Sequence, residues 1–277
     1  MLLIKCKFTA CKLVNDMNLS LNGKTALICG STQGIGLATA QELALLGATC
    51  VLFARNETAL QAAITTLDTA GGQQHQYIVA DFSAPDQVKA AAETLAARQP
   101  VHILINNSGG PAGGPITDAA PEAFLAAFNQ HLICNHLITN AVAPGMKNEG
   151  YGRVINIIST SVKIPLKGLG VSNTIRGAVA SWAKTMANEL GQYNITVNNV
   201  LPGATLTQRL ETIIDNKSQK TGLEKASVEE EMLNEIPMRR FGKAQEIANV
   251  IAFLASPAAA YVNGTSIPVD GGRTGSI

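Results

Sequence analysis

The chain has almost no net charge, which removes the main electrostatic reason for binding nucleic acid or an anionic membrane. Its 277 residues contain 21 Lys and Arg against 20 Asp and Glu, for a formal net charge of +1. Proteins that bind such polyanions usually carry a clear excess of positive charge. We therefore expect neither a nucleic-acid partner nor a membrane partner.

Long apolar runs are also missing. No apolar stretch approaches the roughly 18–20 residues that a membrane-spanning helix needs. Residues 1–16 carry Lys5, Lys7 and Lys12 among short apolar pieces, without the continuous apolar segment of about 7–15 residues that marks a secretory signal. We interpret residues 1–16 as a disordered N-terminal extension, residues 17–277 as a single domain, and the protein as cytoplasmic.

Paired cysteines are absent too. The five cysteines are scattered, and the sequence contains neither a CxxC pair nor a Cys/His cluster. Metal sites and disulfide frameworks usually show such spacing. The sequence therefore predicts no metal site and no disulfide framework.

What the sequence does have is a regular alternation of short apolar runs with helical patterns. Such alternation predicts a parallel sheet with right-handed crossovers and helices on both faces, a Rossmann-type, doubly wound, three-layer α/β fold. The more polar residues 204–238 are expected to form short helices over the site as a lid. We expect seven strands near 25–28, 48–54, 76–80, 101–105, 153–158, 194–201 and 265–270, and long helices near 37–46, 56–71, 121–146, 172–190 and 243–254.

A glycine-rich turn joins the first predicted strand to the first predicted helix. Its spacing is GxxxGxG, from Gly30 through Gly34 to Gly36. Glycines allow a tight turn and a close approach of the backbone to a pyrophosphate, whose charge the N–H groups of the following helix stabilise. The candidate cofactor residues of this turn are Gly30, Ser31, Thr32, Gln33, Gly34, Ile35 and Gly36.

The end of the second predicted strand bears on the choice of cofactor. Ala54 and Arg55 stand about twenty residues past the glycine turn, where an acidic residue would bind the ribose 2′-hydroxyl of NAD. Ala54 cannot do this, whereas the guanidinium of Arg55 suits a 2′-phosphate. The sequence therefore favours NADP(H) over NAD(H).

Several motifs in this order resemble the short-chain dehydrogenase/reductase family, and its 3-oxoacyl-(acyl carrier protein) reductases in particular. The resemblance runs from about Leu19 to Gly272. It implies an oxidoreductase acting on a small carbonyl compound or secondary alcohol. It also implies a homo-oligomer, tetramer or dimer, formed through the helices near 121–146 and 172–190 and the C-terminal strand. The motifs are Gly30-x-x-x-Gly34-x-Gly36, Asp81, Asn106-Asn107-Ser108-Gly109, Ser159, Pro202-Gly203 with Thr207, and Val269-Asp270-Gly271-Gly272.

The same resemblance implies the remaining cofactor contacts. Asp81 would hold the adenine, the loop from Asn106 to Gly109 would line the adenosine ribose, and the segment after Pro202 would seat the nicotinamide and the pyrophosphate. The residues implied in this way are Asp81, Phe82, Asn107, Ser108, Gly109, Arg176, Pro202, Gly203, Thr205 and Thr207.

The catalytic group departs from the family pattern, which has a Ser, a Tyr, a Lys four residues later and an Asn on the preceding long helix. Ser159 is in place, but Ser172 stands at the Tyr position, Arg176 at the Lys position and His131 at the Asn position. A serine hydroxyl is a much weaker acid than a phenol, and arginine keeps its proton near pH 7. The tyrosine mechanism of the family cannot operate here.

Another group must then supply the proton. His131 is one candidate, because imidazole titrates near neutral pH; Lys163 and Lys167, on the loop between Ser159 and Ser172, are others. Our leading interpretation is an atypical NADP(H)-dependent oxidoreductase. The alternatives are a nucleotide-binding homologue without turnover, serving as a sensor or scaffold subunit, and a lyase or isomerase that uses the nucleotide as a fixture.

Overall fold

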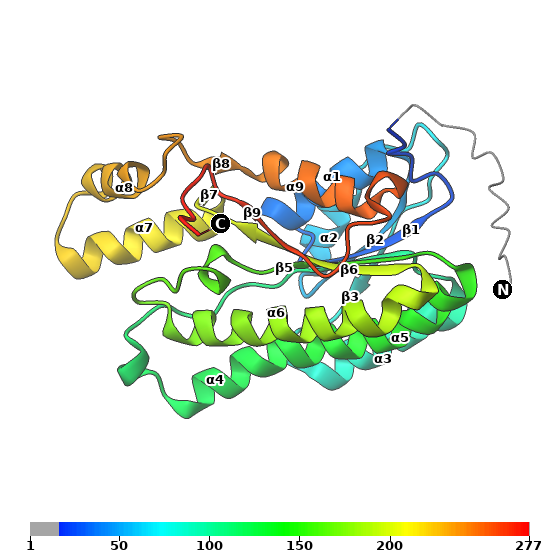
Figure 1. The fold of residues 1–277 in the computed structure, drawn as a ribbon, viewed down its shortest axis with the longest axis horizontal. Helices are drawn as coiled ribbons and strands as arrows, with labels where there is room; N and C mark the ends of the chain where they lie inside the picture. Colours follow the sequence, from blue (N-terminus) through cyan, green and yellow to red (C-terminus); the bar gives the residue numbers. More distant parts are fainter. Residues whose placement is uncertain (1–16, 277) are drawn as a thin grey trace, which may run out of the picture.

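The computed structural model describes residues 17–276 and contains the predicted seven-stranded parallel sheet (Figure 1). Its strand order is β3-β2-β1-β4-β5-β6-β9, so the chain moves outward from β1 in one direction and then from β4 in the other. The predicted extension 1–16 lies outside the described residues. The strands are β1 (Thr25–Cys29), β2 (Thr49–Ala54), β3 (Gln76–Val79), β4 (Ile103–Asn106), β5 (Gly152–Ile157), β6 (Ile195–Pro202) and β9 (Ser266–Val269).

Helices cover both faces of the sheet and make a three-layer sandwich, as predicted (Figure 1). One apolar cluster joins the first face to α1 (Gly34–Leu45), α2 (Glu57–Ile64) and α9 (Ala244–Ala255). A second joins the other face to α3 (Pro85–Arg98), α5 (Cys134–Glu149) and α6 (Gly170–Leu190). Burying both faces in this way explains why the strands read as continuous apolar runs.

Two helices differ from their predicted extents. The helix expected to reach 71 ends at Ile64, where the hydroxyls of Thr65 and Thr66 donate to the carbonyls of Ala62 and Ala63. Such local bonds compete with continuation of a helix. The helix expected over 121–146 is α4 (Pro121–Phe128) followed by a π-helical turn over Asn129–Ile133 and then by α5. Turns of this kind occur often at functional sites.

The segment 204–238 forms short helices, as predicted. These are α7 (Gln208–Thr221) and α8 (Lys225–Asn234), and Figure 1 shows them extending beyond one edge of the sheet. A small parallel pair connects the start of the segment, at β7 (Thr205–Leu206), with β8 (Gly242–Lys243), which follows the segment. Four short 3₁₀ helices complete the described chain, at Ile116–Asp118, Thr160–Val162, Gly191–Tyr193 and Pro257–Ala259.

None of the helices in residues 17–276 combines the length and the apolar character that crossing a membrane requires.

Candidate active site

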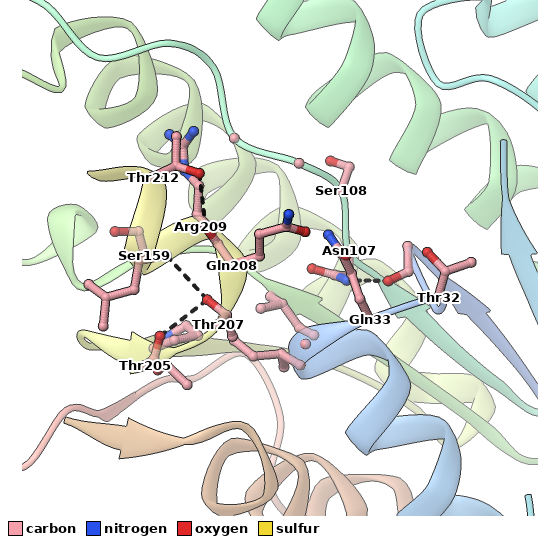
Figure 2. A pocket seen from close by; sticks show the side chains of 18 of the residues that line it. Thr32, Gln33, Asn107, Ser108, Ser159, Thr205, Thr207, Gln208, Arg209 and Thr212 are labelled. Atoms are coloured by element: carbon pink, nitrogen blue, oxygen red, sulfur yellow. Dashed lines mark hydrogen bonds between the residues drawn. The ribbon is translucent and has the colours of Figure 1, made fainter. Parts of the chain in front are cut away.

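A cavity of about 760 Å³ opens at the carboxyl ends of the strands. It lies where the strand order reverses between β1 and β4, the usual ligand position in open α/β sheets. Its size falls within the range of cofactor and substrate pockets. Figure 2 shows Thr32 and Gln33 on one side of this opening and Ser159 and Arg209 on the other, with Thr207 between them.

The glycine turn presents a free helix N-terminus to the cavity. Gln33, at the N-cap of α1, makes no side-chain cap, and the first turn of α1 contains no acidic side chain. Gly34 has a φ of +55°, and a β-carbon at Gly36 would stand 2.1 Å from the carbonyl oxygen of Gly30. The backbone N–H groups of this turn therefore remain available to an anion, as the binding of a dinucleotide pyrophosphate requires.

Two predicted residues of this turn support it without lining the cavity. Ser31 is fully buried, and its hydroxyl accepts a hydrogen bond from the backbone N–H of Phe53 at 3.0 Å. Position 36 requires a glycine because a β-carbon there would collide with the backbone of Gly30. Ser31 and Gly36 therefore support the conformation of the turn.

Arg55 and Asp81 lie together at one end of the cavity. Asp81 accepts a hydrogen bond from the backbone N–H of Ser83 at 2.8 Å. The hydrogen bonds from Ser83, and the smaller effect of the Arg55 charge, lower the pKa of this carboxyl. Arg55 is exposed and has no carboxylate within 4.0 Å among the described residues, so its guanidinium can take a phosphate.

The asparagines at the end of β4 and in the loop after it hold neighbouring elements in place. Asn107 donates to the carbonyls of Cys29 and Gly30 at 3.3 and 3.2 Å and so fixes the glycine turn. Asn106, expected to line the adenosine ribose, is buried and outside the cavity lining. Its side chain donates to Asn156, which donates to Asn199, at 2.8 and 3.0 Å. This row of amides ties β4, β5 and β6 together.

The cavity brings most of the predicted residues together. The predicted residues that line it are Gly30, Thr32, Gln33, Gly34, Ile35, Arg55, Asp81, Phe82, Asn107, Ser108, Gly109, Ser159, Ser172, Arg176, Pro202, Gly203, Thr205 and Thr207.

Two serines line the end of the cavity opposite Arg55. The Ser159 hydroxyl accepts a hydrogen bond from the backbone N–H of Ser161 at 3.1 Å. Its own proton is therefore available to a ligand oxygen. Ser172 is half-buried in the first turn of α6 and also lines the cavity.

Arg176 stands one helical turn after Ser172 and is 8% exposed. One nitrogen donates to the carbonyl of Ile157 at 3.1 Å. Burial, and the nearby charge of Arg209, lower the pKa of Arg176 from its usual value to about 10. It still carries its charge at neutral pH, without an acidic partner within 4.0 Å in residues 17–276.

His131 lies in the π-helical turn, 1% exposed. Its Nδ1 lies 2.6 Å from the hydroxyl of Ser108, and its Nε2 is buried without a partner among the described groups. Burial, reinforced by the charge of Arg176, lowers the pKa of His131 to about 2. The expectation that this imidazole titrates near neutral pH is therefore wrong: it is neutral there and cannot release a proton as an imidazolium.

The two candidate lysines lie away from the cavity, and two residues absent from the predicted set line it. Lys163 and Lys167 are exposed and lie outside the cavity lining. Arg209 and Gln130, which we did not predict, line the cavity. The signal for Arg209 was its position two residues after Thr207, but nothing in the spacing showed that α7 turns this side chain toward the opening.

Comparison with known proteins agrees with this architecture. Residues 30–274 match the family model described as enoyl-(acyl carrier protein) reductase. The chain is 33% identical over 262 residues to 7alpha-hydroxysteroid dehydrogenase of Escherichia coli, covering 93% of this chain and 97% of that protein. The chain belongs to the short-chain dehydrogenase/reductase family.

Other family members show how widely the likeness extends. The chain is 32% identical over 256 residues to 3-oxoacyl-(acyl-carrier-protein) reductase FabG of Pseudomonas aeruginosa, covering 92% and 98% of the two chains. L-sorbose reductase from Gluconobacter frateurii, solved with NADPH and L-sorbose, superimposes with a TM-score of 0.87 at 30% identity, covering 94% and 100%. NAD⁺-bound xylitol dehydrogenase gives 0.84 at 28%, covering 91% and 99%.

These relatives are oxidoreductases, and the family uses nicotinamide cofactors. The solved relatives include one with NADPH and one with NAD⁺. Family membership alone therefore does not determine which of the two dinucleotides this chain binds.

Proposed function

We propose that the chain is an NADP(H)-dependent oxidoreductase that interconverts a small carbonyl compound and its secondary alcohol, with an active site built without the family tyrosine and lysine. One observation carries the proposal: a single cavity is lined by the glycine turn, Arg55, Ser159 and Arg176. A dinucleotide and a small second ligand placed there would meet a phosphate site at one end and hydroxyl donors at the other.

The cofactor preference rests on the Arg55 end. An exposed guanidinium beside the end of β2 suits the 2′-phosphate of NADP(H), and Ala54 and Arg55 give that strand end no carboxylate for a free 2′-hydroxyl. The free N–H groups at the start of α1 suit the pyrophosphate. Asp81 keeps a carboxylate oxygen for the adenine after its bond to Ser83.

The chemistry rests on the opposite end. When bound, the reduced nicotinamide supplies a hydride to the carbonyl carbon. Ser159 donates its hydroxyl to the substrate oxygen, and the charge of Arg176 stabilises the negative charge that develops there, while one of its N–H groups holds a ribose hydroxyl. Ser172 lines the space where the family has a phenol and leaves room for water.

The proton route differs from the one that the sequence suggested. His131 is neutral, so its role is to accept a hydrogen bond from Ser108 or donate one to it, and thereby to hold that loop. We propose that the substrate oxygen receives its proton through the hydroxyls of Ser159 and Ser172 from water in the cavity. A positioned acid typically contributes about 10²–10⁴ in rate, so turnover should be slower than with a tyrosine by a factor of that order.

The segment 204–238 would act as the lid, because its first helix contributes Arg209 to the cavity wall. We further propose a homo-oligomer formed through α4, α5 and α6. Leu125 on α4 is 64% exposed and Phe128 is 37% exposed, an apolar surface that a second copy would cover. Light scattering on the purified chain should give twice or four times the mass of the monomer.

The test of function is NADPH oxidation, followed by absorbance, against a panel of ketones, aldehydes and 3-oxoacyl thioesters. Oxidation with at least one of them, slower with NADH and abolished in Ser159→Ala, supports the proposal. Tight NADPH binding without oxidation across the panel would favour a nucleotide sensor or scaffold subunit instead. That alternative draws on Ser172 in place of a phenol and on the low pKa of His131.

A further inference from the structure

The end of the cavity that holds Ser159 has an unbalanced positive charge. Arg55, Arg176 and Arg209 all line the cavity, against a single acidic residue, Asp81, among the described lining residues. Asp81 is at the far end, where the charge of Arg55 acts on it. The end that holds Ser159 therefore has two guanidinium groups and no carboxylate.

Arg176 has hydrogen-bonding capacity that the protein does not use. The residue is buried, and within residues 17–276 its one protein acceptor is the carbonyl of Ile157. A guanidinium has five N–H groups in a planar fork. Because Arg176 lines the cavity, the N–H groups that are not bonded to the protein are available to a ligand there. An unpaired buried charge costs stability, and an opposite charge placed beside it would offset part of that cost.

Arg209 approaches the same space from the lid. It donates to the carbonyl of Pro111 at 2.8 Å and so bridges the first turn of α7 to the loop after β4. Like Ser159, it lines the cavity. Its charge is close enough to lower the pKa of Arg176. Two like charges held together in this way would be stabilised by an anion between them.

We propose that this enzyme selects substrates carrying a carboxylate, and that Arg176 and Arg209 bind it while Ser159 holds the neighbouring carbonyl. The proposal rests on the proposed function and adds the substrate class to it. Arg176 donates to the carbonyl of Ile157, two residues before Ser159, so its guanidinium lies close to the end of β5 that carries the Ser159 hydroxyl. That closeness suits an oxo acid with its carboxylate within two or three carbons of the carbonyl. A bidentate carboxylate on a guanidinium also gives geometric specificity.

The chemical alternative is an oxyanion of the cofactor itself. The pyrophosphate has its own site at the start of α1, which favours the substrate as the source of the anion. The experiment must nonetheless separate the two, because a phosphate and a carboxylate offer the same kind of oxygen to arginine.

The experiment is calorimetric titration of acetoacetate, and of its neutral methyl ester, into the full chain with and without NADP⁺. The oxidised cofactor prevents reduction of the ketone, so binding is measured apart from catalysis. We expect acetoacetate to bind about 10²-fold more tightly than the ester in at least one of the two conditions. Arg209→Gln should weaken the binding of acetoacetate and leave the binding of the ester unchanged, so that most of the ratio between the two affinities is lost. Arg209→Lys should retain part of that ratio.

Lys220→Gln is the matched control. It removes one positive charge from the same helix α7, at an exposed side chain outside the cavity lining. It should leave the ratio of acid to ester unchanged, whereas loss of the ratio in this variant would mean a general charge effect and would overturn the proposal.

Two other results would also overturn it. Equal affinity for acid and ester would show that the pair does not recognise a carboxylate, even if NADPH is oxidised with neutral ketones. A loss of NADP⁺ affinity in Arg209→Gln with an unchanged ratio of acid to ester would assign the pair to the cofactor phosphate. A ratio that depends on Arg209, in a protein that oxidises no NADPH, would uphold this inference and refute the proposed function.

Discussion

Replacing His131 with asparagine should make the fold less sensitive to acid. The imidazole is buried, and desolvation together with the charge of Arg176 lowers its pKa from 6.5 in the unfolded chain to about 2. Below pH 6.5 the unfolded chain therefore takes up a proton at this position that the folded chain does not. Stability from this group is full above the unfolded pKa and falls as the pH drops toward 2.

The magnitude follows from the two pKa values. Between pH 7.5 and pH 4.5 the wild-type chain should lose about 2–3 kcal/mol of unfolding free energy through His131 alone, since each pKa unit is worth about 1.4 kcal/mol. Asparagine does not titrate, so His131→Asn should lack this loss. Other groups contribute equally to both chains and cancel in the difference.

The assay is urea unfolding followed by circular dichroism at several pH values from 7.5 to 4.5. The difference in unfolding free energy between the two chains should shift by about 2–3 kcal/mol in favour of the variant across that range. Parallel curves would refute the reasoning, because they would mean that His131 titrates alike in the folded and unfolded chains. His102→Gln is the comparison variant: burial also lowers the pKa of His102, but Glu149 opposes the shift, so its effect should be smaller.

Three further predictions concern the cofactor and the chemistry. Arg55→Ala should weaken NADPH binding about 10- to 10²-fold, the value of one charge-assisted contact, and leave NADH binding unchanged. Fluorescence titration measures both affinities, and equal losses for the two cofactors would show that Arg55 does not bind the 2′-phosphate. Gly36→Ala should destabilise the fold and weaken NADPH binding, because its methyl group would stand 2.1 Å from the Gly30 carbonyl oxygen, whereas Gly177→Ala, with no neighbour within 4 Å, should raise the melting temperature. Ser159→Ala should lower kcat by about 10²-fold or more at unchanged NADPH affinity, and an unaffected rate would exclude Ser159 from the reaction.

Much of the fold could be predicted from the sequence because it depends on local patterns. Strands buried on both faces appear as apolar runs, and helices between them appear as periodic patterns, so all seven sheet strands were found within about two residues of their observed ends. The early end of α2 was missed. It depends on hydroxyl bonds from Thr65 and Thr66 that look no different in sequence from helix-compatible residues.

The candidate site was predictable where the backbone carries the function and much less so where side-chain environment does. The glycine turn and the serines follow strand ends, so their meeting at one sheet edge could be expected. The neutral state of His131 could not, because it arises from burial and from Arg176, 45 positions away in sequence. Arg209 was missed for the same reason: its approach to the cavity depends on how α7 packs against the loop near Pro111.

The most direct test of the account is the fate of the nicotinamide hydrogen. The full chain is incubated with NADPH carrying deuterium at both C4 positions and with the best oxo acid or ketone found in the panel, and the product is analysed by mass spectrometry. The account predicts one deuterium in the alcohol for each NADPH oxidised. Binding of the nucleotide with no labelled alcohol from any carbonyl compound tested would contradict it.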